Sequence, residues 1–370
     1  MKTNLKRALA AIAALIAVAI VAFCGLYLTR FETMASVNKL TDRSDYNLYS
    51  MDVSYDYNLD DITGYGITDN QSMVDAIVKE AIPVLPVHIE VPNFGCSALG
   101  IKATTGDDAG HELTGRNYDF NKDTSCMLVH AHPKDGYESI AFAALDNVGA
   151  NDATGSLVSR VASLTAPFIC LDGINEKGVA VAVLMVSSDS VNQDTGKAKL
   201  PTTIAIRMIL DQAASTEEAI ELLEKYDMFA QAGGDYHFYV NDASGDARII
   251  EYDPEDEARS IVATPVDAVT NFYELYSDRV LPNQKNGIYG YGKERYEAIQ
   301  EVFSRDADGY SEQTAWDALK ASSQTRESGS TSNTQWSIVF DNTDCSAKVV
   351  FQRDWDSVYD CKLDGQAKRE

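Results

Sequence analysis

Cys96 is the side chain in this sequence best placed to act as a nucleophile, because charged residues come near it in the expected fold. It directly follows Gly95 and begins a stretch that favours strand structure. Arg116 and Asp119 end the next such stretch, and the turn between the two lies around 106–108. An antiparallel hairpin with this turn places Cys96 opposite a residue between 116 and 120. A thiol, a guanidinium and a carboxylate can therefore meet, which suits nucleophilic catalysis.

The two charged residues lie an odd number of positions apart, so strict strand alternation sends Arg116 and Asp119 to opposite faces. We expect a bend or bulge if both side chains reach Cys96. Other readings of these residues remain open. Cysteine is often a small buried hydrophobic residue, and an arginine and an aspartate at a strand end can form a structural ion pair.

The surrounding pattern predicts a layered α+β domain in which helices cover antiparallel sheets. Strands are expected at 97–103, 112–120, 139–145, 168–171, 179–186, 236–241, 247–252, 261–270, 335–340, 347–352 and 358–363. Helices are expected at 204–213, 219–226, 293–303 and 313–321. Ser215 and the residues after it form a helix start signal before the second of these helices.

The composition excludes several classes of protein. The chain has 370 residues, a formal net charge of −25 and a pI near 4.5, so it would repel the phosphates of nucleic acid. Hydrophobic residues make up 45 %, which is too many for a disordered acidic chain. The six cysteines show no CxxC pair, so we expect no structural metal site. Cys345 and Cys361 flank a predicted hairpin, but their pairing stays open.

The N-terminal end predicts a membrane anchor. Residues 1–7 carry basic side chains, and 8–28 form an uncharged apolar stretch long enough to cross a bilayer as a helix. The positive-inside rule then places 1–7 in the cytoplasm and the rest outside the cell. If 8–28 are instead a cleaved signal, the protein is secreted. Residues 29–95 are acidic and read as a stalk or pro-segment with a helix at 73–82, and 96–370 form the main domain.

A series of motifs runs in order through this main domain. They are Gly95-Cys96, GRNYDF at 115–120, GINEKGVAVA at 173–182, STEEAIELL at 215–223, YHFYVNDASGDARIIEYD at 236–253, VTNFY at 269–273, ERYEAI at 294–299 and WSIVFD at 336–341. In this order the chain resembles the linear amide C–N hydrolases of the N-terminal-nucleophile superfamily. That group includes choloylglycine hydrolases, penicillin V acylases, acid-ceramidase-like amidases and the isopenicillin N acyltransferase branch.

The resemblance implies a four-layer αββα fold and activation by autoproteolysis between Gly95 and Cys96. A free α-amine has a pKa near 7.7–8.0, so an N-terminal cysteine carries its own general base, which the uncut chain lacks. Arg116 would favour the thiolate and Asp119 would orient the α-amine. Asn271 would donate an N–H to the oxyanion, and Arg295 would be a supporting charge.

Some of these roles have structural alternatives. Asn271 could be a turn residue and Arg295 a surface ion pair on its helix. Met185 stands where choloylglycine hydrolases carry a second oxyanion asparagine. This departure argues against bile-salt specificity more than against amide hydrolysis.

The expected activity is hydrolysis of a linear amide, with N-acyl amide, bile-salt or penicillin V-like substrates. Acyl transfer to an amine, dipeptide hydrolysis and a non-catalytic acidic binding module at the cell surface are the alternatives. No metal or organic cofactor is implied, because the thiol and its own amine supply the chemistry. The oligomeric state is left open.

Overall fold

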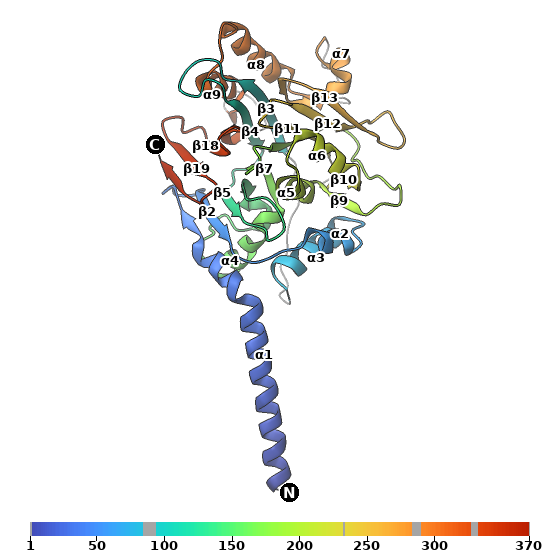
Figure 1. The fold of residues 1–370 in the computed structure, drawn as a ribbon, viewed down its shortest axis with the longest axis vertical. Coiled ribbons are helices and arrows are strands. Elements are labelled where there is room, and N and C mark those ends of the chain that lie inside the picture. The colour runs from blue at the N-terminus through green and yellow to red at the C-terminus, as the bar shows by residue number, and fades with distance from the viewer. Residues whose placement is uncertain (1, 84–93, 232–233, 283–289, 327–331, 370) are drawn as a thin grey trace.

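Two stacked β-sheets with helices on both outer faces form the body of the protein, and one long helix projects from it (Figure 1). The computed structural model describes residues 2–83, 94–231, 234–282, 290–326 and 332–369. The helices are α1 (Lys2–Ser36), α2 (Leu59–Gly64), α3 (Asn70–Ala81), α4 (Leu157–Ala162), α5 (Thr202–Gln212), α6 (Thr216–Leu223), α7 (Ser277–Val280), α8 (Lys293–Arg305) and α9 (Glu312–Ser322). Short 3₁₀ turns occupy Leu145–Val148, Ser163–Phe168 and Glu274–Tyr276.

The first sheet has the strand order β1-β2-β5-β6-β7-β8-β11-β12-β13. Its strands are β1 (Asn38–Lys39), β2 (Leu48–Val53), β5 (Cys126–Ala131), β6 (Ser139–Ala144), β7 (Cys170–Asn175), β8 (Ala180–Val186), β11 (Asp235–Asn241), β12 (Arg248–Tyr252) and β13 (Ile261–Pro265). Neighbouring strands are antiparallel, except that β2 runs parallel to β5. The short strands β9 (Lys199–Pro201) and β10 (Asp227–Phe229) pair separately.

The second sheet is antiparallel and has the order β14-β3-β4-β17-β18-β19-β20. Its strands are β14 (Ala268–Val269), β3 (Phe94–Lys102), β4 (Glu112–Phe120), β17 (Asn333–Asp341), β18 (Ser346–Phe351), β19 (Val358–Lys362) and β20 (Ala367–Arg369). A further small pair, β15 (Asn271–Phe272) with β16 (Gly290–Tyr291), lies outside both sheets.

The layers follow from strand alternation. Cys96 and Ala98 on β3 face the large core between the sheets, whereas Leu99 and Ile101 face a second core under α8 and α9. On the other side, α5 packs against β7 and β8, and α6 packs against β11. The predicted four-layer αββα arrangement is confirmed.

Local signals explain much of this arrangement, with two corrections. The side chain of Ser215 accepts the backbone N–H of Glu218 and begins α6, as predicted. The single strand expected at 261–270 is wrong, because β13 belongs to the first sheet and β14 to the second. The strand expected at 168–171 begins later, since a 3₁₀ turn runs through Phe168. All six cysteines are free thiols.

The segment before Gly95 contributes to the body. Strand β2 lies beside β5 in the first sheet, and α3 covers most of the helix predicted at 73–82. Arg30, near the end of α1, is buried and donates to the carbonyls of Glu80 and Ala81 at 2.7 and 2.8 Å. A boundary between pro-segment and catalytic domain at residue 95 stays a prediction.

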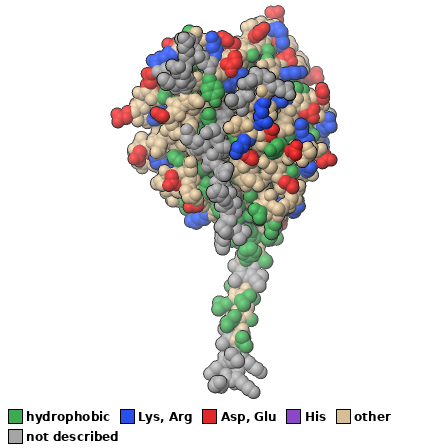
Figure 2. Space-filling model, turned by 180° about the vertical axis from the view of Figure 1, so that it is seen from behind, with side chains coloured by type: hydrophobic (Ala, Val, Ile, Leu, Met, Phe, Trp, Pro, Cys, Tyr) green, Lys and Arg blue, Asp and Glu red, His purple; other side chains and the backbone are tan. Residues whose placement is uncertain are grey.

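Helix α1 carries the apolar N-terminal stretch. The candidate span Ile12–Ser36 contains an 18-residue stretch with a mean hydropathy of 2.5, and the helix is long and apolar enough for a membrane span or a signal sequence. Figure 2 shows hydrophobic side chains along this projecting helix below the body. The helix continues past residue 28, where the predicted apolar segment ends, and its last turns dock on the body.

Candidate active site

Cys96 lies on β3 directly opposite Tyr118 of β4, so the hairpin register predicted from the turn is confirmed. Its side chain is fully buried on the face between the sheets. The guanidinium of Arg116 and the backbone N–H of Asp119 lie close to the thiol, and both favour its charged form. Burial raises the pKa of the Cys96 thiol to about 11, although the positive charge of Arg116 opposes this shift. In the continuous chain the thiol is therefore protonated at neutral pH.

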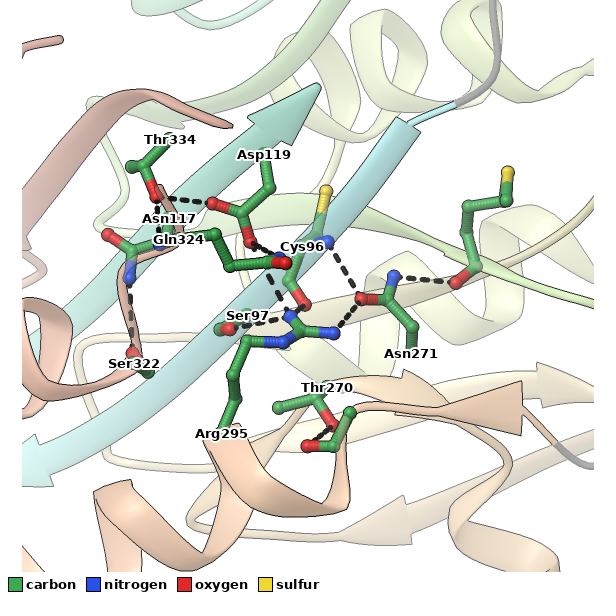
Figure 3. A network of polar contacts seen from close by, with 12 residues as sticks. Cys96, Ser97, Asn117, Asp119, Thr270, Asn271, Arg295, Ser322, Gln324 and Thr334 are labelled. Carbon is green, nitrogen blue, oxygen red and sulfur yellow. Dashed lines mark hydrogen bonds and ion pairs between the residues drawn. The ribbon is translucent and has the colours of Figure 1, made fainter. Parts of the chain in front are cut away.

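Arg116 and Asp119 approach Cys96 from different sides, because β3 and β4 pair without any shift of register. The register shift lies instead in β17, between Thr334 and Trp336. The carboxylate of Asp119 accepts hydrogen bonds from Thr334 Oγ1 at 2.6 Å and Gln324 Nε2 at 2.7 Å (Figure 3). A bend that brings both charged side chains to the thiol is thus not needed: the backbone of Asp119, rather than its carboxylate, contacts the sulfur.

Arg295, on the first turn of α8, joins the two sides of the site. Its Nη1 donates to Ser97 Oγ at 3.0 Å and to the carbonyl oxygen of Cys96, and lies 3.5 Å from Asp119 Oδ2. Its Nη2 donates to Asn271 Oδ1 at 2.7 Å (Figure 3). Arg295 is buried, so this is not the surface ion pair that the helix alone would allow.

Asn271, on β15, holds the main chain of Cys96. Its Oδ1 accepts the Cys96 backbone N–H at 2.8 Å, and its Nδ2 donates to the carbonyl of Met185 at 2.7 Å. An amide nitrogen carries two N–H groups, so one stays available for an oxyanion. Gly290 of β16, which pairs with Phe272, has φ 102°, and a Cβ there would lie 2.0 Å from the Asn271 carbonyl oxygen. Only glycine allows this close pairing.

Asp172, on β7, belongs to the site although sequence reasoning missed it. Its Oδ2 accepts Arg116 Nε at 3.2 Å and Trp336 Nε1 at 3.1 Å. Burial raises the pKa of Asp172 to about 6, and Arg116 opposes the rise. The available signal was an acidic residue within the apolar run 168–174, where a buried carboxylate needs a partner.

The structure therefore brings all the predicted site residues together in one place. Cys96, Arg116, Asp119, Asn271 and Arg295 form one connected network around the peptide unit that follows Gly95. The backbone of Gly95 pairs with Asp119 in the β3–β4 ladder. Their roles in catalysis stay predictions. The described residues of this network offer one thiol, one carboxylate and two guanidinium groups, which suits nucleophilic chemistry more than metal binding.

Comparison with known proteins identifies the family. Residues 104–355 match the model of the family "Acyl-coenzyme A:6-aminopenicillanic acid acyl-transferase". The chain belongs to this family. The match covers Arg116, Asp119, Asn271 and Arg295 but begins after Cys96, so it does not test the nucleophile. No curated protein sequence matches.

Solved structures show the same fold. Crystal structures of two variants of the conjugated bile acid hydrolase from Clostridium perfringens each align with a TM-score of 0.53 at 15 % identity, over 74 % of this chain and 96 % of theirs. Penicillin V acylase from Agrobacterium tumefaciens aligns with a TM-score of 0.50 at 16 % identity, over 74 % of this chain and 98 % of its own. The predicted N-terminal-nucleophile hydrolase fold is confirmed.

Proposed function

We propose that this protein is a cysteine amidohydrolase that activates itself by cutting between Gly95 and Cys96. One observation carries the proposal: separate side chains engage each polar group of Cys96. Arg116 contacts the thiol, Asn271 Oδ1 accepts the N–H, and Arg295 binds the carbonyl oxygen. A cysteine buried only for packing needs no such set of partners.

Activation begins when the Cys96 sulfur attacks the carbonyl carbon of Gly95. The C–S bond forms, the C–N bond to Cys96 breaks, and the thiol proton passes to the departing nitrogen. Water then hydrolyses the thioester, which leaves a carboxylate on Gly95 and a free thiol and α-amine on Cys96. Glycine suits this step because it tolerates strained backbone.

Catalysis then uses the new α-amine as the base. The amine takes the thiol proton, the sulfur attacks the substrate amide, and the proton passes to the leaving amine. Asn271 Oδ1 already faces this nitrogen, and its second N–H can donate to the oxyanion. Arg116 favours the thiolate by its charge. Water resolves the acyl-enzyme and restores the thiol.

Acyl transfer is the second candidate, because the matched family model is that of an acyltransferase. The two activities differ only in whether water or an amine resolves the thioester. Met185 replaces the second oxyanion asparagine of choloylglycine hydrolases, so N-acyl amides other than conjugated bile salts are the better expectation. We further propose that α1 anchors the protein in the cell membrane with the body outside.

The test offers the cut enzyme an N-acyl amino acid, penicillin V and a glycine-conjugated bile salt, each with and without a second amine. The proposal predicts amine release and, by mass spectrometry, an acyl group on the Cys96 peptide during turnover. A new amide of the added amine indicates acyl transfer. Turnover without acylated Cys96 contradicts the mechanism, and no turnover or adduct with any of a broad set of acyl amides favours the non-catalytic binding module.

A further inference from the structure

A second cluster of reactive side chains lies where β2 meets β5, outside the network around Cys96. Asp52 on β2 pairs directly with His130 on β5 in the parallel ladder. His132 follows two residues later, so the alternation of an extended chain turns both imidazoles to one side. Their rings are 3.8 Å apart and nearly perpendicular.

The ring nitrogens of the two histidines divide into two sets. His130 Nδ1 lies 2.9 Å from Asp52 Oδ1 and 2.9 Å from His132 Nε2. The opposite nitrogens, His130 Nε2 and His132 Nδ1, each lie 3.0 Å from the same oxygen, Glu138 Oε1. Each imidazole thus presents one nitrogen to Glu138. Its other nitrogen faces the space among Asp52 and the two histidines, which we call the centre of the cluster.

The positions of the imidazole N–H protons decide whether a positive charge is needed at the centre of the cluster. A carboxylate only accepts hydrogen bonds, and His130 lies between two of them, so a neutral His130 cannot donate to both Asp52 and Glu138. The tautomer suited to binding a cation donates the N–H of each imidazole to Glu138. His130 Nδ1 and His132 Nε2 then carry lone pairs, and these face each other and the Asp52 carboxylate. Three electron-donor atoms within 4.8 Å of one another repel unless a cation lies between them.

The backbone of Gly365 approaches the cluster closely and puts no side chain on it. Gly365, in the turn between β19 and β20, has φ 75°. A Cβ there would come within 2.7 Å of Asp52 Oδ1 and 2.8 Å of His130 Nδ1. The side chains of Asp52 and His132 are 55 % and 47 % exposed, so an ion could enter from solvent and keep a water ligand.

We infer that Asp52, His130 and His132 bind a divalent transition-metal ion, and that Glu138 orients both imidazoles from behind. Two imidazoles and one carboxylate with an open position suit Zn²⁺ better than Mg²⁺ or Ca²⁺, which prefer oxygen ligands. A carboxylate that accepts the second N–H of a ligating histidine is a common outer-shell partner.

The position of the site in the chain gives the ion a further role, which rests on the proposed cleavage. Asp52 precedes Gly95, whereas both histidines follow Cys96. After cleavage the bound ion would connect the two pieces and hold the catalytic piece to the anchored one.

The test measures Zn²⁺ binding to the full chain in detergent after removal of metals with a chelator. The Cys96→Ala variant is used, so that binding is measured whether or not cleavage occurs. Equilibrium dialysis with elemental analysis should find one Zn²⁺ per chain, and Co²⁺ should give the absorption spectrum of a bound ion. His132 is half-exposed, so His132→Asn should fold normally, and its affinity for Zn²⁺ should fall at least 100-fold. Glu138→Gln should lower the affinity about 10–100-fold.

His111→Asn is the matched control, because His111 belongs to a second His-carboxylate cluster among the described residues, with Asp108 and Asp341. It should bind Zn²⁺ as the parent does. Equal binding by His132→Asn, or loss of binding in His111→Asn, overturns the proposed site. If the folded Cys96→Ala protein binds neither Zn²⁺ nor Co²⁺, the proposed site is also overturned. The positive charge at the centre of the cluster would then be a proton on a histidine. In cut wild-type protein, a chelator should increase release of the N-terminal piece.

Discussion

At the scale of single residues, burial keeps the Cys96 thiol protonated in the continuous chain. The pKa of the thiol is raised to about 11 by burial, and Arg116 shares its charge with Asp172. Cleavage would add an amine with a pKa near 7.7–8.0 next to this sulfur. The precursor is therefore expected to be inactive as an amidase, and activation is a change of protonation chemistry at one residue.

Asn271→Ala tests the residue that holds the Cys96 nitrogen. The change removes the acceptor of the Cys96 N–H and the predicted oxyanion donor. We expect a loss on the order of 10²–10³ in kcat for amide hydrolysis, and a similar loss in the rate of autocleavage. Single-turnover kinetics and the rate of appearance of the cut chain measure the two effects.

Asn175→Ala is the matched control for this prediction. Asn175 is also fully buried, but its Nδ2 donates to the carbonyls of Leu210 and Ala213 at 3.0 and 2.8 Å, at the end of α5. It should lower the melting temperature and leave kcat of the folded fraction unchanged. An Asn271→Ala enzyme with wild-type kcat would remove Asn271 from the mechanism.

Asp172→Asn tests how the stability of the protein depends on pH. Burial raises the pKa of Asp172 from 3.8 to about 6 in the folded protein. Between these values the native state binds the extra proton, so the stability due to this group is greatest at low pH and falls as pH rises towards 6. Two pKa units correspond to about 3 kcal/mol. Because the unfolded carboxyl is itself partly protonated at pH 4, wild type should lose about 2 kcal/mol relative to Asp172→Asn between pH 4 and 7.

Urea unfolding of both proteins, each with Cys96→Ala to keep one chain, measures this difference. A difference that stays constant, or that grows in favour of wild type with rising pH, contradicts the assigned direction. The latter result would mean that Arg116 outweighs burial and keeps the carboxylate ionised.

At the scale of elements, the sequence predicted most of the strands and helices that build the site. The Gly106 turn set the register that pairs Cys96 with Tyr118, and alternation set which faces meet the core. Joining of β2 to β5 was not predictable, because parallel pairing between distant segments leaves no local signal. The contact of Asp172 with Arg116 likewise depends on the stacking of two sheets.

The histidine cluster was also missed because it depends on contacts between segments far apart in the sequence. The lack of a CxxC pair predicted no structural metal site, but this criterion concerns cysteine ligands alone. The alternation of His130 and His132 was visible, but Asp52 and Glu138 reach them only through sheet pairing and a loop. A histidine pair at strand spacing is a signal worth testing against the fold.

Met51→Ala tests the role of β2 as a strand of the body. Met51 is buried and pairs with Val129 of β5. Removing a buried methionine side chain costs about 2–5 kcal/mol, so the N-terminal piece of the cut chain should dissociate at a lower urea concentration. Size-exclusion chromatography of the cut protein in increasing urea measures this midpoint.

Ser50→Ala, one position earlier on the same strand, should change the free energy of dissociation by no more than about 0.5 kcal/mol, so its urea midpoint should stay close to that of the wild type. If the N-terminal piece separates from wild-type protein without any urea, β2 does not hold the two pieces together.

At the scale of the whole molecule, α1 divides into a projecting part and a docked part. Tyr27, Arg30 and Thr33 are buried against the body, whereas most described side chains before them are exposed. Deleting 1–25 should therefore give a protein that is soluble without detergent and keeps the melting temperature of the full chain. Deleting 1–36 should lower that temperature, because the bonds from Arg30 to the end of α3 are lost.

Detergent-free chromatography and thermal melts of the two deletions test this division. A 1–25 deletion that still requires detergent would place apolar surface on the body itself, and equal melting temperatures would show that docking of α1 contributes nothing.

The central claim is that Cys96 becomes an N-terminal nucleophile, and intact mass with N-terminal sequencing tests it most directly. Wild-type protein and Cys96→Ala are incubated at neutral and mildly acidic pH. The account predicts that the wild type yields two pieces, one beginning at Cys96, and that the variant stays whole. A wild-type chain that stays intact under both conditions would contradict the account, because the α-amine that serves as the base would never form.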